Sequence, residues 1–346
     1  MRSLLKTVVL LGVLAGSTLP ACTIPVFRYA LDRWEADPFH LIVPIAWARQ
    51  PENAAVMSLL RAEAVANLEL KEKTDAAAPT PQLFFPRDLE HSLWPGTWDQ
   101  TTVRSMLESP ARRALAERIL SGESVVWVMI DSGKADDDKA TAERVEKRLR
   151  YLEQAAGLPP QDPNDPDSQL GPGPPLKLKF SLLRVARDKA EELPFCHMLA
   201  GPEGGKLLQG GETLLAPVFG RGRVLGAWKA DEMDDTAIED ACLFLAGRCS
   251  CRVKNQSPGW DVLMRLDWAA ALQKATPVAA GTVPPAAPAA FTFDPPSMVT
   301  TTTTGSEPGL IGVSSVVHIP WSFIVGGLFI AIGVAWLVVA GKRSAS

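Results

Sequence analysis

The sequence predicts an α/β protein with one or more mixed sheets and flanking helices, followed by one C-terminal transmembrane helix. Residues 124–131 read SVVWVMID, an almost continuous apolar run that is typical of a strand buried on both faces. After it, Val145, Leu149 and Leu152 recur at helical spacing. Residues 321–340 read WSFIVGGLFIAIGVAWLVVA without a charge, and about twenty helical residues span the hydrocarbon core of a bilayer.

Composition changes along the chain indicate seven segments. The prolines of GLPPQDPNDPDSQLGPGPP exclude a helix or a central strand, and the Pro/Ala/Thr-rich stretch after the last predicted helix has too little apolar surface to fold. In chain order the segments are a signal peptide (1–21), an α/β domain or half-domain (22–156), a Pro-rich loop or linker (157–175), a second α/β domain or half-domain (176–272), a stalk (273–320), the transmembrane helix (321–341) and a cytoplasmic tail (342–346).

The two ends of the chain predict the same orientation. Arg2 and Lys6 precede the apolar residues 7–19, a run that suits a signal peptide and is short for a membrane span. Lys342 and Arg343 follow the last hydrophobic run, and basic residues at the end of a span stay in the cytoplasm. We therefore expect a single-pass protein of the cell membrane whose body is extracytoplasmic, that is, periplasmic.

Cys22 is a candidate for lipidation. The residues Leu19, Pro20 and Ala21 before it resemble the lipobox of bacterial lipoproteins, although Pro20 departs from that pattern. One alternative is cleavage near Ala21 that leaves an ordinary cysteine, and another is retention of the first segment as an uncleaved anchor. The sequence leaves these alternatives open.

In the first half, local signals place six elements. Ser109 is a good N-cap and Pro110 suits the first helical position. Apolar residues at helical spacing mark the other helices, and short apolar runs mark the strands. The predicted helices are 25–34, 52–70 and 109–120, and the predicted strands are 39–47, 82–85 and 124–131.

In the second half, residues 176–185 alternate apolar and polar side chains as a strand does. Gly220 and Gly222 indicate a hairpin between strands 212–219 and 223–228. A short helix is expected at 191–199, and a longer one begins at Asp234 or Asp235 and ends at Gly247, with Cys242 on its apolar face. An extended piece at 248–254 follows it.

The cysteines are the main candidates for chemistry. A structural cysteine or a disulfide is the favoured interpretation, because an exported domain permits disulfides. In an alternative interpretation Cys249 and Cys251 form a strained redox pair, with Cys242 as a third thiol, although no Cys-x-x-Cys spacing occurs. In another, a soft metal binds the set Cys196, His197, Cys249 and Cys251.

Other classes of function find little support in the sequence. The net charge of −4 and the pI of about 5.7 argue against a nucleic-acid surface. The four histidines are scattered, and no P-loop or Gly-x-Ser-x-Gly elbow occurs, so we expect no cofactor, and the sequence favours a non-enzymatic role. Four tryptophans in or near loops are interpreted as core closure rather than as an exposed patch: Trp94, Trp98, Trp260 and Trp268.

Two resemblances add to this interpretation. Residues 22–34, CTIPVFRYALDRW, together with Cys249-Ser-Cys251-x-Val-Lys254 and Pro258-Gly259-x-Asp261, resemble an uncharacterised family of exported, membrane-anchored bacterial proteins, and this resemblance implies no activity. The hairpin at 212–228 with the helix at 235–246 resembles the closing β-β-α half of a thioredoxin-like domain. That family's catalytic dithiol is matched at no position, and fold resemblance alone does not carry function.

These observations predict a membrane-tethered extracytoplasmic binding or assembly protein that is non-catalytic. The membrane is its expected partner, together with a membrane protein complex of unknown identity. The alternative is a membrane-anchored thiol–disulfide or metal-handling protein that uses Cys249 and Cys251.

Overall fold

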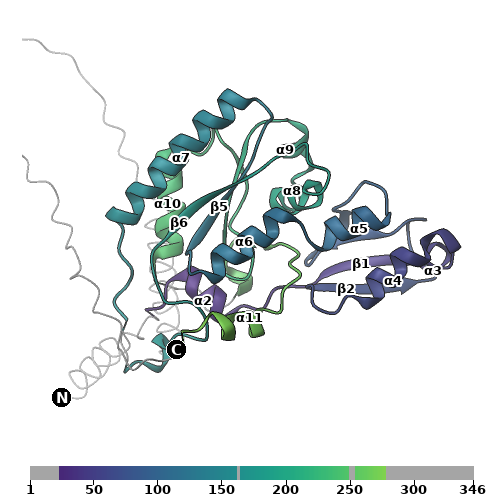
Figure 1. Cartoon of the computed structure of the whole chain (residues 1–346), viewed down its shortest axis with the longest axis horizontal. Coiled ribbons are helices and arrows are strands. Elements are labelled where there is room, and N and C mark those ends of the chain that lie inside the picture. The colour runs from purple at the N-terminus through teal and green to yellow at the C-terminus, as the bar shows by residue number, and fades with distance from the viewer. Residues whose placement is uncertain (1–22, 162–163, 249–253, 278–346) are drawn as a thin grey trace, which may run out of the picture. The chain divides into compact units, whose positions relative to one another are not determined.

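The computed structural model describes residues 23–161, 164–248 and 254–277 (Figure 1). These residues form two mixed sheets with flanking helices, so the predicted α/β class is confirmed. Several predicted features lie outside the described residues. They are the signal peptide, Cys22, Cys249, Cys251, most of the stalk and the transmembrane helix. Within the described ranges no helix combines the length and the apolar character that a membrane span requires.

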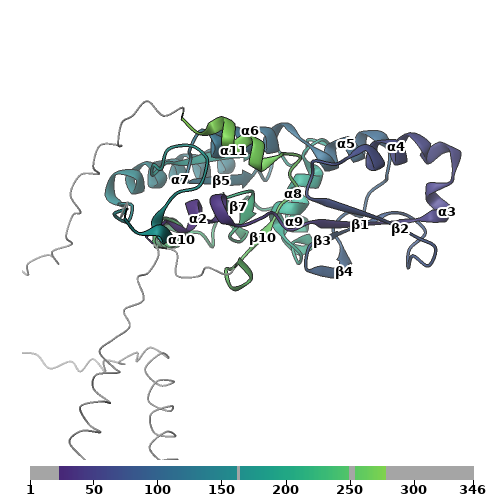
Figure 2. The ribbon, with the colours of Figure 1, turned by 90° about the horizontal axis from the view of Figure 1, so that it is seen from below.

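The first sheet has the strand order β2-β1-β3-β4. β1 and β2 are parallel, and the other neighbours are antiparallel. Figure 2 shows α4 and α5 on the same side of this sheet. Its elements are β1 (Phe39–Pro44), α3 (Ile45–Ala48), η1 (Pro51–Asn53), α4 (Ala54–Ala62), β2 (Leu68–Lys73), β3 (Gln82–Phe85), β4 (Asp88–Ser92) and α5 (Gln100–Leu107).

The second sheet has the order β10-β8-β7-β5-β6, with β9 also paired to β7. β5 is parallel to β6 and antiparallel to β7, so strands from before and after the Pro-rich loop share one sheet. The elements are α2 (Val26–Arg33), α6 (Pro110–Leu120), β5 (Val125–Ile130), α7 (Ala135–Ala155), η2 (Pro166–Ser168), β6 (Phe180–Val185), α8 (Leu193–Ala200), α9 (Gly205–Gln209), β7 (Leu214–Phe219), β8 (Arg223–Val224), β9 (Trp228–Lys229), α10 (Asp235–Ala246), η3 (Lys254–Gln256), β10 (Trp260–Asp261) and α11 (Trp268–Ala275).

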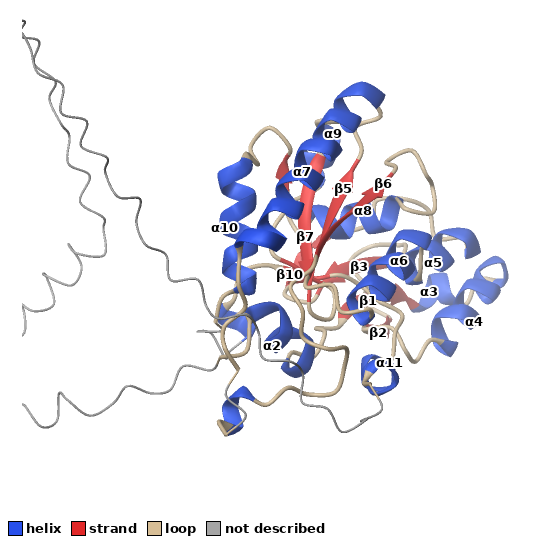
Figure 3. Ribbon diagram, turned by 60° about the vertical axis from the view of Figure 1, so that its left-hand side comes forward, coloured by secondary structure: helices blue, strands red, loops and turns tan. Residues whose placement is uncertain are grey.

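Two hydrophobic cores lie on opposite faces of the second sheet. β5 is buried on both faces, as its apolar run predicts, and its alternate side chains enter different cores. Trp127 packs with residues of α2, α7 and α10, whereas Val128 packs with residues of α6, α8 and α11. Figure 3 shows α7 and α10 beside the strands of this sheet. The core that contains Val128 continues into the first sheet, so both sheets belong to one folded body.

The Pro-rich loop is fixed to α2. Arg28 is buried and donates hydrogen bonds to the carbonyl oxygens of Gly171, at 2.8 Å, and Pro174. Asp32 forms an ion pair of 2.8 Å with Arg28 and accepts a hydrogen bond from the Gly171 amide. Burial raises the pKa of Asp32, and the nearby Arg28 charge only partly opposes this rise. The first helix of the body is therefore tied to a loop that is distant in sequence.

The structure differs from the predicted elements in several places. The helix predicted at 52–70 ends at Ala62, and β2 begins at Leu68. Glu63 accepts hydrogen bonds from the amides of Val65 and Ala66, which turns the chain out of the helix. The strand predicted at 39–47 likewise ends at Pro44, because the next four residues form α3. The sequence interpretation also missed β4, α5, α9, β10 and α11, and the strand predicted at 223–228 is two short strands, β8 and β9.

Candidate functional site

A cleft of about 480 Å³ lies between the two sheets, and clefts of this size at such boundaries are typical small-molecule sites. One wall comes from β3, β4 and the segment after β4. The other wall comes from α8, α9 and the turn that joins them. The lining residues are Phe85, Ser92, Leu93, Pro95, Arg187, Leu193, Cys196, His197, Gly201, Pro202, Gly205, Leu208 and Gln209.

His197 is a titratable side chain that lines the cleft. It is half-buried on α8, and the edge of its ring meets Trp94 at 5.6 Å between centroids and 82° between planes. Within the described residues its imidazole makes no hydrogen bond or ion pair. Burial lowers its pKa, so the ring is neutral at pH 7 and offers one donor and one acceptor.

Arg187 borders the cleft, but its guanidinium already has partners. It donates to the carbonyl oxygens of Asp131, at 3.2 Å, and Leu208, at 2.6 Å, and also to that of Glu212. These bonds fix the end of α9 against the second sheet. The cleft therefore presents apolar surface and a neutral ring more than a free positive charge.

Trp260 closes the back of the second wall. Its indole N–H donates to the carbonyl oxygen of Met198 at 2.8 Å, near the end of α8. Gly201 follows α8 with φ of +87°, and a Cβ atom there would lie 2.5 Å from the Trp260 ring. The turn that shapes this wall therefore requires glycine. Trp98 and Trp268 are buried, and Trp94 and Trp260 are partly buried, in agreement with the core-closure interpretation.

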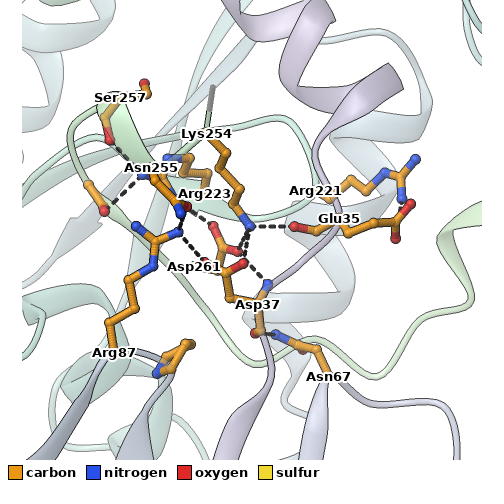
Figure 4. A network of polar contacts seen from close by, with 12 residues as sticks. Glu35, Asp37, Asn67, Arg87, Arg221, Arg223, Lys254, Asn255, Ser257 and Asp261 are labelled. Atoms are coloured by element: carbon orange, nitrogen blue, oxygen red, sulfur yellow. Dashed lines mark hydrogen bonds and ion pairs between the residues drawn. The ribbon is translucent and has the colours of Figure 1, made fainter. Parts of the chain in front are cut away.

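A polar network lies in the same seam between the sheets (Figure 4). Asp261 and Arg223, whose side chains are each 3% exposed, form an ion pair of 3.1 Å. Lys254 contacts Asp261 and also Asp37, the latter at 3.0 Å. The Asp37 amide donates to Asp261 at 2.7 Å. Asp261 thus connects the segment after α2 with β8 and η3.

The outer part of this network includes residues of the first sheet. Arg87 pairs with Asp37 at 2.9 Å, and the Asn67 side chain donates to the Asp37 carbonyl at 2.9 Å. Arg221 pairs with Glu35 at 2.9 Å. A second pocket of about 190 Å³ borders the network and shares Phe85 and Pro202 with the cleft. The network therefore fixes the position of one sheet on the other beside the cleft.

A larger hollow of about 1300 Å³ lies along α7 and α10, and it is a less specific site. It is a groove between charged side chains of both signs. Arg144 in it already donates to the carbonyl oxygens of Ala230 and Met233, and Arg148 pairs with Glu239. Because Arg144 and Arg148 are engaged and the groove is more open to solvent than the cleft, we take the cleft as the candidate site.

The described cysteines are separated and buried. Cys196 lines the cleft and belongs to one core, whereas Cys242 belongs to the core on the other face of the second sheet. Both are free thiols, and burial raises the pKa of each to about 12. In the described ranges no group of three His, Cys, Asp or Glu side chains is placed to hold a metal ion. Cys249 and Cys251, the other residues of the proposed redox and metal sets, lie outside these ranges.

We expect Cys196 and Cys242 to resist alkylation in the folded protein. A buried thiol with a raised pKa supplies almost no thiolate at pH 8, so labelling must wait for the fold to open. Iodoacetamide treatment followed by peptide mass spectrometry would measure this, with urea-unfolded protein as the control. Rapid labelling of either residue in the folded protein would contradict the buried placement.

The chain was also compared with known proteins. No family model, curated protein or solved structure matches the chain. The functional assignment therefore rests on the cleft and the seam. The sequence interpretation had singled out Cys196, His197 and Trp94, but it had no signal for the opposite wall, because Phe85 and Leu93 read as ordinary core residues.

Proposed function

We propose that this protein is a membrane-tethered extracytoplasmic binding protein and that the cleft between the two sheets is its ligand site. The observation that carries this proposal is the cleft itself, which has the size of a small-molecule site and mostly apolar walls. The membrane tether follows from the signal-peptide pattern and the uncharged run at 321–340.

The lining favours an uncharged ligand with an apolar or aromatic part. Leu93 and Leu193 offer apolar surface, and the His197 ring can stack or form one hydrogen bond. Gln209 and Ser92 add polar groups at the rim, which suits orientation of the ligand rather than reaction. Because the Cys196 thiol stays protonated, it is a poor nucleophile, and a binding role is favoured over a catalytic one.

The fold proposal that accompanies this function is a thioredoxin-like arrangement in the second sheet. Support comes from the β5–β6 parallel pair, the antiparallel β7 and β8, and α10 after them. We also propose that the protein assembles with a membrane protein complex. This proposal is supported by the proposed tether, which would keep the body at the membrane surface. Neither proposal brings a catalytic dithiol to the cleft.

The cleft can be tested by filling it. Gly205 lines the cleft and has open space where a Cβ atom would lie, so Gly205→Trp should fill the cleft without a clash. Native mass spectrometry of the detergent-solubilised full chain should find a small molecule on the wild type and lose it in Gly205→Trp. His197→Phe should weaken retention roughly tenfold, as expected for one lost hydrogen bond to a buried ligand.

Gly157→Trp is the matched control, because Gly157 also has open space around its Cβ position and does not line the cleft. This variant should retain the ligand. The proposal fails if the wild type carries no ligand, or if Gly205→Trp retains the same ligand as the wild type.

The thiol or metal-handling alternative that uses Cys249 and Cys251 also has one supporting observation. Arg248, which precedes Cys249, forms a β-bridge with Pro25, three residues after Cys22. The described neighbours of these cysteines therefore lie together. Thiol trapping and metal analysis of the purified full chain decide it: the alternative fails if neither Cys249 nor Cys251 reacts and no metal co-purifies.

A further inference from the structure

The exposed apolar side chains of the body are unevenly distributed. Of the six large ones in the described ranges, four lie on α7, on the Pro-rich loop and on α10. These are Tyr151 (54% exposed), Leu170 (38%), Leu243 (44%) and Phe244 (44%). Adjacent exposed leucine and phenylalanine at a helix end are costly in water unless another surface covers them.

Two of these segments, the Pro-rich loop and the end of α10, contact the residues where the chain enters the body, and α7 packs on α10. Thr23 is the first described residue, and its hydroxyl group donates to Ser168 of the loop at 2.5 Å. The Val26 amide donates to the Gly247 carbonyl at 3.0 Å, directly after α10. α7 packs on α10, so Tyr151 and Leu243 lie on neighbouring helices.

The chain also leaves the body near this loop. Gly173 of the loop donates its amide hydrogen to the Thr276 hydroxyl at 2.7 Å, and the described residues end at 277. Both segments with a membrane signal in the sequence, residues 7–19 and 321–340, therefore connect to the body at the Pro-rich loop.

We propose that Leu243 and Phe244, together with Tyr151 and Leu170, form a surface that rests on the lipid bilayer. This inference depends on the proposed membrane tether and on an anchor at the N-terminus as well, either lipidation of Cys22 or an uncleaved first segment. Val26 lies four positions after Cys22, and an extended chain of four steps reaches at most about 14 Å. An anchor at or before Cys22 therefore holds the end of α10 within reach of the membrane surface.

A surface of four apolar side chains suffices here because the contact is intramolecular. A free amphipathic surface needs a large apolar area to bind a membrane, but a tethered one has a high effective lipid concentration. Leu and Phe are suited to the boundary between head groups and acyl chains. Arg248 is exposed four residues after Phe244, and its charge suits anionic head groups.

Photocrosslinking of the full chain tests this surface. Phe244 is replaced by p-benzoylphenylalanine, which preserves an aromatic group at an exposed position, and the protein is reconstituted in vesicles of phosphatidylethanolamine and phosphatidylglycerol. Irradiation should give lipid adducts at position 244. The same replacement at Leu89, which is 59% exposed on β4 of the first sheet, should give at least tenfold fewer adducts.

The outcomes separate this inference from the proposed function. If the protein stays with the vesicles but position 244 gives no more lipid adduct than position 89, the lipid surface is wrong and the tether stands. Adducts from position 244 to a second copy, or to residues 321–340 of the same chain, likewise overturn the lipid surface. If the protein does not stay with the vesicles at all, the tether itself is wrong.

Discussion

Replacement of Arg112 by methionine is expected to lower the free energy of unfolding by about 3 kcal/mol or more. Arg112 is 2% exposed, and its guanidinium donates to the carbonyl oxygens of Met106, at 2.8 Å, Leu263, at 3.0 Å, and Ser105. Burial lowers its pKa to about 10, so the group is still charged at pH 7. Methionine fills similar space but leaves three buried acceptors without a donor, and each costs about 1–3 kcal/mol.

The measurement is the urea midpoint of the purified protein, followed by tryptophan fluorescence. Arg113→Met is the matched control, because that side chain is 61% exposed and its distance to Glu108 is 3.7 Å. The control should change stability by less than about 0.5 kcal/mol. Equal midpoints for the two variants would contradict the role of Arg112 as the connection between α5, α6 and the segment before α11.

Replacement of Asp261 by asparagine is expected to cost about 3 kcal/mol and to loosen the seam. Asp261 is the shared anion of Arg223 and Lys254, whose side chains are 3% and 12% exposed. Without its charge, Arg223 loses its ion pair in a buried position, and Asp37 becomes the main partner of Lys254. Breaking a buried ion pair by removal of one partner is generally far more costly than breaking a surface pair.

Hydrogen exchange locates the effect. The Asp37 amide donates to Asp261, so exchange should become faster there and through the neighbouring residues 34–36 in the Asp261→Asn variant. Asp240→Asn makes the same chemical change at an exposed position of α10 and should alter neither stability nor this exchange. Unchanged exchange at Asp37 in the Asp261→Asn variant would show that the network does not hold the seam.

Elements whose signals are local were predictable from the sequence. β5 follows from a continuous apolar run, α6 from the Ser109-Pro110 start, and the β7–β8 turn from two glycines that both adopt positive φ. β2 was not predictable in this way, because LELKEK is a charged edge strand whose pairing with β1 determines its conformation. There the tertiary contact prevails over the helix propensity of Leu, Glu and Lys.

The site was less predictable than the fold, because its parts are distant in sequence. Arg112 bonds a carbonyl 151 positions away, and the Asp37–Asp261 bond joins residues 224 positions apart. The two segments quoted for the first resemblance, around Trp34 and around Asp261, meet in the seam, where Arg223 lies over the Trp34 ring. No signal in the sequence indicated that these segments lie together in space, and none indicated the cleft beside them.

The bond between Val26 and Gly247 joins the start of the body to a late part of the chain, which delays completion of the fold during synthesis. The chain is made from its N-terminus, so α2 is among the first parts synthesised, whereas β7 and α10, against which it packs, are made much later. β5 likewise pairs with two strands, β6 and β7, that are synthesised after it. Until residue 247 has been made, the apolar face of α2 lacks the part of its native packing that α10 supplies. We expect nascent chains that stop short of this residue to need a holding chaperone.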